Sequence, residues 1–329
     1  MSLVIQGKNL FLPALIPSIS SFETQIRPES AFDLQAALSE PITLVSAYDI
    51  HSSPSLKEKV KQFRSEGKIV LMDSGGYEAS RINRYSKDEE RWTFEKFKTC
   101  VNYCETELVA SFDYFMKSGQ AFADYETEFV SFIQEHDFVD KESLIPVIHI
   151  QDYDGTYNFS QKEIVSICER IAAEFSPIFI AIPERELGSG MAEKVRSVRV
   201  ISECLSRTTR QTKLHVLGCG NPLSFALLCA AGASMADGLE WCRTLVGADF
   251  KLHHFQQAEL FDEPDSKIYN PTVEVIRSTS SDYRILTLTR NLYALQQFNT
   301  EVMNMLSLGR LADFIEDNFG VKAAQLING

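Results

Sequence analysis

Five titratable side chains follow predicted strands, at the positions where parallel α/β proteins keep their chemistry. Each lies at or just past the C-terminal end of a short apolar run, and they are Asp73, Asp113, His149, Glu184 and Asp237. Because the carboxyl ends of parallel strands meet at one edge of a sheet or one mouth of a barrel, we expect these groups to converge. Carboxylates in one cleft can act as general acid, general base and nucleophile. The pattern therefore predicts chemistry carried by carboxylates.

The stretch around Asp73 has a second notable feature. An apolar run at 69–72 leads into the sequence Asp73-Ser74-Gly75-Gly76-Tyr77. Two glycines without Cβ atoms let the backbone approach a ligand closely. A capped turn at the end of a buried strand uses the same residue types. This stretch alone does not separate the two interpretations, and the rest of the chain must decide between them.

Metal-binding and nucleotide-binding motifs are absent from the sequence. There is no HExxH, no Cys-x-Cys-x-x-Cys, no GxGxxG and no P-loop. Cys100 and Cys104 lie four residues apart in a helical-looking segment, without a second pair or a histidine in register, so we interpret them as helix-face residues. We expect no metal and no cofactor.

Short apolar runs alternate with amphipathic stretches along most of the chain. The runs predict strands at 11–15, 42–48, 69–77, 108–113, 144–149, 178–183, 213–218 and 233–238. Helices are predicted at 55–67, 86–105, 125–135, 161–175, 193–207 and 222–232. Strands that alternate with helices form parallel βα units, and a count near eight favours a (β/α)8 TIM barrel. We expect a single α/β domain over residues 1–329, with a barrel core at about 9–260, a loop at 262–282 and closing helices at 285–319.

Composition restricts the classes of function. The chain has 329 residues, of which 44% are hydrophobic and 23% charged, and no apolar run is long enough to span a membrane. The first eight residues lack the apolar stretch of a secretory signal, and seven cysteines suggest reduced thiols in a cytoplasmic protein. A net charge of −13 argues against nonspecific coating of nucleic acid. A negative net charge remains compatible with local basic patches, and the candidates are residues 194–213 and the region around Arg243.

Several motifs, taken in order, resemble the tRNA-guanine transglycosylase family. The first, Met72-Asp73-Ser74-Gly75-Gly76-Tyr77, is similar to the family's Asp-Ser-Gly-Gly-Phe/Tyr motif. Further matches are Ser111-Phe112-Asp113, His215-Val216-Leu217-Gly218-Cys219-Gly220-Asn221-Pro222 and Gly232-Ala233-Ser234-Met235-Ala236-Asp237. Members of the family are (β/α)8 barrels that exchange guanine for a 7-deazaguanine base in an intact polynucleotide. The ordered set of motifs is more specific than any one of them.

The resemblance implies a role for each matching residue. Asp237 would be the nucleophile that holds a covalent glycosyl intermediate, as the carboxylate of a retaining glycosidase does. Asp73 would be the general acid and base for the departing and incoming bases. The implied base-binding residues are Asp113 at the base edge, Tyr77 and Leu217 on its two faces, and the glycines Gly75, Gly76 and Gly218. Arg243 falls where the family's nucleic-acid-binding arginine would lie. The alternative for each is structural: a capping aspartate, a core tyrosine or a barrel-lining leucine.

Three departures from the family's pattern change the expected substrate. No cysteine follows Cys242, so the family's Cys-x-Cys-x-x-Cys-x(n)-His zinc site and its subdomain cannot form. His149 stands where the family has a glutamine, and Pro183-Glu184-Arg185 replaces a Gly-Gly-Leu turn. A carboxylate near the base would suit a cationic 7-substituent, whereas an arginine would suit a nitrile or carboxylate. The sequence does not decide whether Glu184 or Arg185 faces the base.

The departures favour a pentosyltransferase that inserts a preQ0-like 7-deazaguanine into DNA, with tRNA as the alternative polymer. A base within a duplex would have to be flipped out or presented single-stranded. Two other classes stay open: a nucleoside or base hydrolase on the same scaffold, and a catalytically silent protein that binds 7-deazaguanines. The presence of both Asp73 and Asp237 argues against the silent protein. The sequence leaves open a homodimer or partner proteins.

Overall fold

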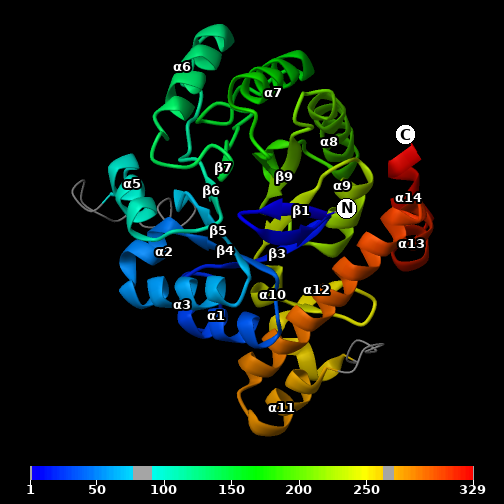
Figure 1. The fold of residues 1–329 in the computed structure, drawn as a ribbon. Coiled ribbons are helices and arrows are strands. Elements are labelled where there is room, and N and C mark those ends of the chain that lie inside the picture. The colour runs from blue at the N-terminus through cyan, green and yellow to red at the C-terminus, as the bar shows by residue number, and fades with distance from the viewer. Residues whose placement is uncertain (1, 77–90, 262–269, 329) are drawn as a thin grey trace.

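The computed structural model describes residues 2–76, 91–261 and 270–328, and its centre is a barrel (Figure 1). In these ranges eight parallel strands follow one another around a single sheet in chain order. They are β3 (Ala14–Ile19), β4 (Ile42–Ser46), β5 (Ile69–Asp73), β6 (Leu108–Ala110), β7 (Leu144–Ile145), β8 (Phe179–Pro183), β9 (Lys213–Leu217) and β10 (Met235–Gly238). Val147 and Ala181 form a parallel bridge that joins the last pair of strands, with Ile148 N donating to Ala181 O at 2.8 Å. The predicted (β/α)8 barrel is confirmed.

Helices surround the barrel and connect its strands. The ring contains α1 (Pro28–Ala37), α2 (Ala47–Ser52), α3 (Pro54–Ser65), α5 (Phe94–Tyr103), α6 (Phe122–Gln134), α7 (Gln161–Phe175), α8 (Met191–Ser206) and α9 (Pro222–Ala230). Local sequence determines where several of them begin. Ser160 and Glu163 form a capping box at α7, and Asn221 caps α9 with Pro222 in its first turn.

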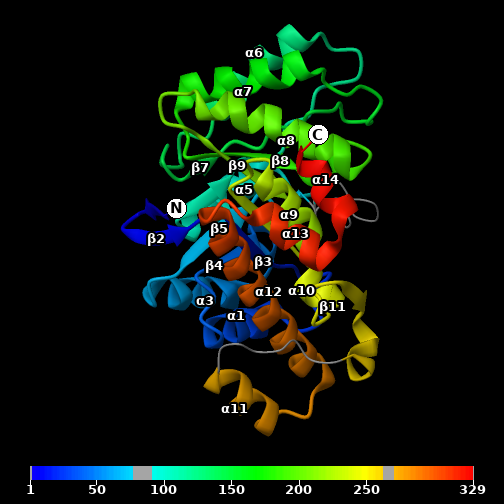
Figure 2. The same ribbon diagram turned by 90° about the vertical axis from the view of Figure 1, so that its right-hand side faces the viewer.

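The chain after β10 completes the ring with additional elements. They are α10 (Glu240–Arg243), β11 (Thr244–Val246), β12 (Leu252–His254), the 3-10 helix η3 (Phe255–Leu260), α11 (Pro271–Thr279), α12 (Tyr283–Ser307), α13 (Leu311–Phe319) and α14 (Val321–Asn328). The long helix α12 packs on β3, α9 and α10, so it takes the place of the eighth barrel helix (Figure 2).

Apolar side chains form two layers, one on each face of the sheet. The inner layer fills the barrel with residues such as Ile16, Leu44, Leu71 and Met235, and the outer layer packs the strands against the helices. This arrangement follows from strand geometry, because alternate residues point to opposite faces. Burial of each such side chain contributes about 1.5–3 kcal/mol.

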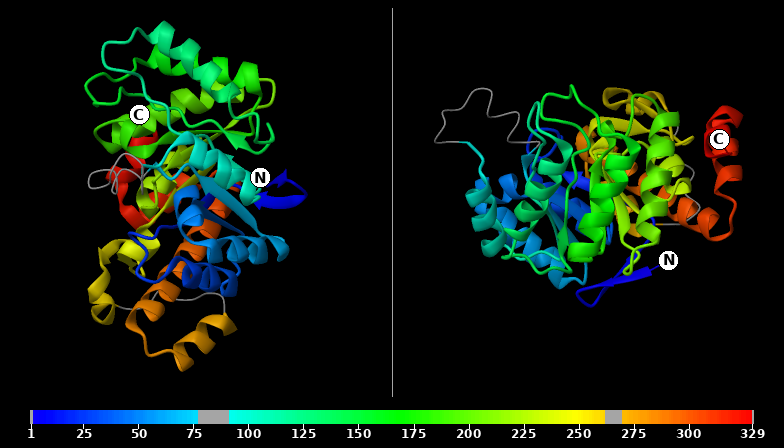
Figure 3. Two further views of the ribbon diagram at one scale, coloured as in Figure 1. Left: turned by 90° about the vertical axis from the view of Figure 1, so that its left-hand side faces the viewer. Right: turned by 90° about the horizontal axis from the view of Figure 1, so that it is seen from above.

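An N-terminal hairpin covers one end of the barrel, as Figure 3 shows. Its strands are β1 (Ser2–Ile5) and β2 (Lys8–Phe11), and Ile5 and Leu10 join the inner apolar layer. Lys8 Nζ binds the buried Glu107 Oε1 at 2.8 Å, so an ion pair fixes the hairpin to the wall. The hairpin lies at the N-terminal ends of the strands, which leaves the opposite end as the mouth.

Some sequence predictions were wrong in their bounds. The loop predicted at 262–282 contains helix α11, which Asn270 caps through Thr272 N and Val273 N. The helix predicted at 86–105 begins only at Phe94 within the described residues. The strand predicted at 42–48 ends at Ser46, which caps a helix that starts at Ala47. In each case a cap formed by Ser, Thr or Asn ends the preceding segment and starts the helix.

The helices of the described segments fall short of what a bilayer crossing requires. None combines the length and the apolar composition that a crossing would need.

Candidate active site at the barrel mouth

Asp237 and Asp73 point into the barrel from its C-terminal end. Met235, two residues before Asp237, and Leu71, two residues before Asp73, both belong to the inner apolar layer. Since side chains alternate along a strand, the two aspartates lie on the same inner face, above that layer. Strands β3 and β4 separate β10 from β5 in the sheet. The structure thus places both predicted catalytic residues at the mouth.

Three donors hold the Asp237 carboxylate. His215 Nε2 lies 3.0 Å from Oδ1, Gly218 N donates to Oδ1 at 3.2 Å, and Ser18 Oγ donates to Oδ2 at 2.9 Å. The residue is 7% exposed. Among these contacts, Oδ1 therefore has two partners and Oδ2 has one, the Ser18 hydroxyl. They hold the carboxylate in one orientation, and Oδ2 is the less constrained oxygen.

His215 is part of this arrangement through one ring nitrogen only. Its side chain is fully buried, and Nδ1 has no hydrogen-bond partner in the described part of the chain. The shared contact with Asp237 assigns the ring proton to Nε2, because a carboxylate oxygen can only accept there. His215 therefore acts as a fixed donor to Asp237.

Asp73 lies at the end of β5 and begins the glycine turn. Its Oδ2 accepts a hydrogen bond from Gly75 N at 3.3 Å, and Ser46 of β4 is its partner in register. Asp73 is partly exposed, whereas Ser46 is buried. A carboxyl group that reaches solvent and adjoins a turn is accessible for proton transfer with a bound molecule.

The glycine turn fits tightly between the strands. Gly75 has φ +84°, and a Cβ there would lie 2.8 Å from Tyr48 Cβ. A Cβ at Gly76 would lie 1.8 Å from Asp113 Oδ2. Trp92 Nε1 donates to Ser74 O at 2.8 Å and supports the turn from behind. Packing therefore requires both glycines, Gly75 against Tyr48 and Gly76 against Asp113, whatever else they contact.

Asp113 belongs to a buried chain of charges that the sequence predicted only in part. His149 Nε2 lies 3.2 Å from Asp113 Oδ1, and His149 Nδ1 lies 2.8 Å from Glu186 Oε1. Ile150 N donates to Glu186 Oε2 at 2.9 Å, and Ser74 Oγ donates to Asp113 Oδ2 at 3.2 Å. Burial lowers the pKa of His149, but the hydrogen bonds and charges of Asp113 and Glu186 outweigh it and raise the pKa to about 9. The imidazolium ion at neutral pH thus joins two carboxylates.

An aromatic side chain covers this histidine. The ring of Phe115 stacks on His149 with centroids 3.8 Å apart, and Tyr153 meets Phe115 edge-on at 5.7 Å. His149 is 3% exposed, while 24% of the Asp113 side chain is exposed. Asp113 is therefore the member of the chain that a ligand in the mouth can reach, and His149 lies behind it.

The turn after β8 settles which side chains enter the wall. Glu184 and Arg185 belong to the short 3-10 helix η2 (Glu184–Glu186), where Glu184 pairs with Lys194 at 2.6 Å and the Arg185 side chain is 69% exposed. The next residue, Glu186, turns inward to His149. The turn thus brings a fourth acidic residue into the site, in addition to Asp73, Asp113 and Asp237.

The remaining predicted site residues are Leu217, Gly218, Arg243 and Tyr77. Leu217 ends β9 on the inner face and packs against the inner apolar layer, and Gly218 follows it with φ +73° and open space where a Cβ would be. Arg243, at the end of α10, pairs with Glu23 at 3.5 Å and is half exposed. Tyr77 lies outside the described residues.

Ser18, Ser74 and Glu186 are site residues that sequence reasoning missed. Ser18 lies two residues after Ile16 on β3, so strand alternation alone could have placed it beside the strand ends. Glu186 had no such signal, since it lies in a 3-10 turn beyond its strand.

Within the described ranges, no three His, Cys, Asp or Glu side chains are arranged to hold a metal ion.

The fold and the mouth together define a (β/α)8 barrel with aspartates on the inner ends of its third and eighth strands. No protein-family model matches the sequence, and no curated protein matches it.

Proposed function

We propose that the protein is a transglycosylase that exchanges guanine for a 7-deazaguanine base in a polynucleotide. The observation that carries this proposal is the pair of inner-face carboxylates at the mouth, Asp237 held by three donors and Asp73 beside a glycine turn. One oriented carboxylate and one solvent-accessible carboxyl are the two groups that a double-displacement at an anomeric carbon requires.

In the first half of the reaction, Asp237 attacks C1′ of the target nucleotide. A bond forms between a carboxylate oxygen and C1′, the bond from C1′ to N9 of guanine breaks, and Asp73 donates a proton to the departing base. Among the described residues Oδ2 accepts from the Ser18 hydroxyl alone, which makes Oδ2 the better candidate for the attacking oxygen. His215 and Gly218 keep the other oxygen in place.

In the second half, the incoming base displaces the enzyme. Asp73 accepts the proton of N9 of the 7-deazaguanine, N9 bonds to C1′, and the ester to Asp237 breaks. Asp113, the exposed end of the charge chain, accepts hydrogen bonds from the donor-rich edge of the purine. His149 and Glu186 fix Asp113 from behind.

DNA is the polymer we favour, with tRNA as the alternative. The basis is that no cysteine follows Cys242, so the zinc region that accompanies tRNA recognition in the resembling family is missing. A base taken from DNA would have to leave its stack to reach the mouth.

The test is incorporation of radiolabelled guanine and preQ0 into DNA and into tRNA. We expect label in DNA, and a loss on the order of 1,000-fold or more in Asp237→Ala and Asp73→Ala. Asp313→Ala, an exposed aspartate on α13, is the matched control and should retain activity. Without an incoming base, the wild-type protein should retain labelled polynucleotide on a denaturing gel, and Asp237→Ala should not.

Other outcomes would change the proposal in defined ways. If label enters only tRNA, the substrate polymer is tRNA and not DNA. Release of free guanine without incorporation would indicate a hydrolase on the same scaffold. Unchanged incorporation in Asp237→Ala would refute the role of Asp237 as nucleophile.

A further inference from the structure

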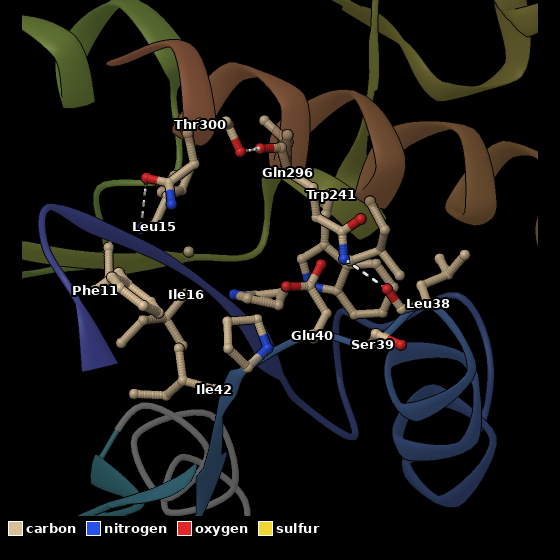
Figure 4. A pocket seen from close by; sticks show the side chains of 18 of the residues that line it. Phe11, Leu15, Ile16, Leu38, Ser39, Glu40, Ile42, Trp241, Gln296 and Thr300 are labelled. Carbon is tan, nitrogen blue, oxygen red and sulfur yellow. Dashed lines mark hydrogen bonds between the residues drawn. The ribbon is translucent and has the colours of Figure 1, made fainter. Parts of the chain in front are cut away.

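A cavity of about 300 Å³ lies outside the barrel wall, between β3, the segment that enters β4, and α12 (Figure 4). Leu15 and Leu38 form part of its apolar lining, together with Trp241 and Leu292. Its volume is at the small end of the range of about 300–1,000 Å³ for ligand pockets. The lining suits a molecule with one ring and a short side chain.

A buried carboxyl group, that of Glu40, lines this cavity. Glu40 is 5% exposed, and Figure 4 shows its carboxylate between the Trp241 ring and the side chain of Gln296. Within the described ranges it has no ion pair. The nearest base, Lys68, directs its Nζ to Glu66 at 2.6 Å and to Ala36 O at 2.8 Å.

The charge of Glu40 is therefore poorly compensated. Burial raises its pKa to about 8, against smaller opposing effects of Gln296 and Lys68. The cavity's other carboxylate, Glu240, lies at the far end beside Gly220 and Gly238, and burial raises its pKa as well. A buried carboxylate that is hydrogen-bonded to an amide but has no cation beside it carries a desolvation cost that an added cation would offset.

The polar side chains around Glu40 are already occupied by the protein itself. Gln296 Nε2 donates to Leu38 O at 3.0 Å, and Asn299 Oδ1 accepts from Leu15 N at 3.3 Å. Thr300 Oγ1 donates to Gln296 O at 2.9 Å. These bonds fix the rim of the cavity, and Gln296 also hydrogen-bonds the Glu40 carboxyl group, which leaves Glu40 as the group whose charge can recognise a ligand.

We propose that this cavity binds a small organic cation whose flat apolar body packs between Trp241 and α12 and whose ammonium or amidinium group pairs with Glu40. The walls select an apolar body, and the buried carboxylate of Glu40 selects positive charge. Leu15 and Pro17 line the cavity from the strand face opposite to the barrel interior. The cavity is also lined by Gly238, the residue after Asp237, but Glu40 takes no part in the proposed base exchange.

The experiment titrates the whole protein with 2-phenylethylamine and benzamidine, using calorimetry and ligand-observed NMR. The controls are 2-phenylethanol and phenylacetate, which keep the ring and replace the cation by a neutral or negative group. We expect saturable binding of both cations and none of phenylacetate. Glu40→Gln should weaken the cations at least tenfold, whereas Glu316→Gln, the same change on the exposed face of α13, should not.

Proton linkage gives a second readout. Because Glu40 is mostly protonated at pH 7, pairing with a cation should release close to one proton, measured as a heat that depends on the buffer. Glu40→Gln should abolish this release.

A second variant narrows the cavity without altering Glu40. Thr300 is exposed at the rim, so Thr300→Phe should weaken both cations several-fold while retaining proton release. The proposal is overturned if neither cation binds, if both variants bind them as the wild type does, or if phenylacetate binds equally well.

Discussion

The barrel mouth and the α12 cavity contain buried carboxylates in opposite circumstances. At the mouth, Asp237 accepts hydrogen bonds from Ser18, His215 and Gly218, and Glu186 binds both His149 and a backbone amide. In the cavity, Glu40 lies near Trp241 and is hydrogen-bonded to Gln296, and among the described residues it has no ion pair. Strand β3 contributes to both regions, through Ser18 on one face and Leu15 on the other.

The difference shows that burial alone does not determine what a carboxylate does to stability. A buried charge with fixed partners is costly to disrupt, because the partner is left uncompensated. A buried carboxylate without a partner costs free energy whenever it ionises. Removing the charge should therefore destabilise the mouth and stabilise the cavity, and the sign of the change distinguishes the two regions.

The largest effect is expected at Glu186. Replacement by Gln removes the negative charge next to His149 and leaves a buried imidazole with a weaker partner. We expect the free energy of unfolding at pH 7 to fall by about 3–5 kcal/mol, as for other broken buried ion pairs. Urea denaturation monitored by circular dichroism measures it.

A matched change at Glu142 separates this effect from loss of charge in general. Its side chain is 71% exposed and pairs with Arg210, so Glu142→Gln should change the free energy of unfolding by less than about 1 kcal/mol. If both substitutions lower the free energy of unfolding equally, the buried pair of Glu186 with His149 contributes no more stability than the exposed pair of Glu142 with Arg210.

The opposite sign is expected at Glu40. Its pKa of about 8 exceeds the ordinary value of 4.5, so at neutral pH the unfolded chain is ionised while the folded chain still holds the proton. Glu40→Gln removes this cost and should increase the free energy of unfolding at pH 7 by about 3 kcal/mol. Thermal unfolding of both proteins at pH 5 and pH 7 measures the gain, which should shrink at pH 5. A variant that is less stable than the wild type at pH 7 would contradict a buried Glu40 whose charge no cation compensates.

The architecture was predictable from the sequence because it depends on local patterns. Apolar runs that alternate with amphipathic stretches predicted the strands and helices, and helix α7 occupies the predicted residues 161–175. Position relative to a strand end also placed Asp73 and Asp237 at the mouth. Their catalytic roles are not settled by that placement and stay a prediction.

Features that depend on long-range contacts could not be predicted in the same way. Glu186 contacts His149 over 37 positions of the chain, through a 3-10 turn that has no periodic signal. The cavity around Glu40 requires α12, which lies more than 240 residues later in the sequence. Strand and helix periodicity gives the face of each element and says nothing of which later element covers it.

A smaller effect is expected from His149 at the mouth, as a pH dependence of the free energy of unfolding. His149 has a folded pKa of about 9 against 6.5 for the free side chain, so the folded state binds more protons between these values. Its contribution to stability is complete below about pH 6.5 and is lost as the pH rises through 9. In the Glu40→Gln background, which removes the titration of Glu40, the free energy of unfolding should fall on the order of 2 kcal/mol between pH 6.5 and 9. Urea denaturation at several pH values gives the slope, and a flat profile would rule out an imidazolium ion at His149.

The smallest effect is expected at Ser18. Its replacement tests whether two of the three donors to Asp237 still orient the carboxylate when the third is removed. Its hydroxyl is one of three donors to that carboxylate, so Ser18→Ala removes a hydrogen bond while His215 and Gly218 still orient Oδ1. We expect the free energy of unfolding to fall by about 1 kcal/mol, the usual value for one such bond. Under the proposed reaction Oδ2 is the attacking oxygen, so base exchange should change in kcat rather than KM. A change in KM alone would show that Ser18 contacts the substrate and does not position Asp237.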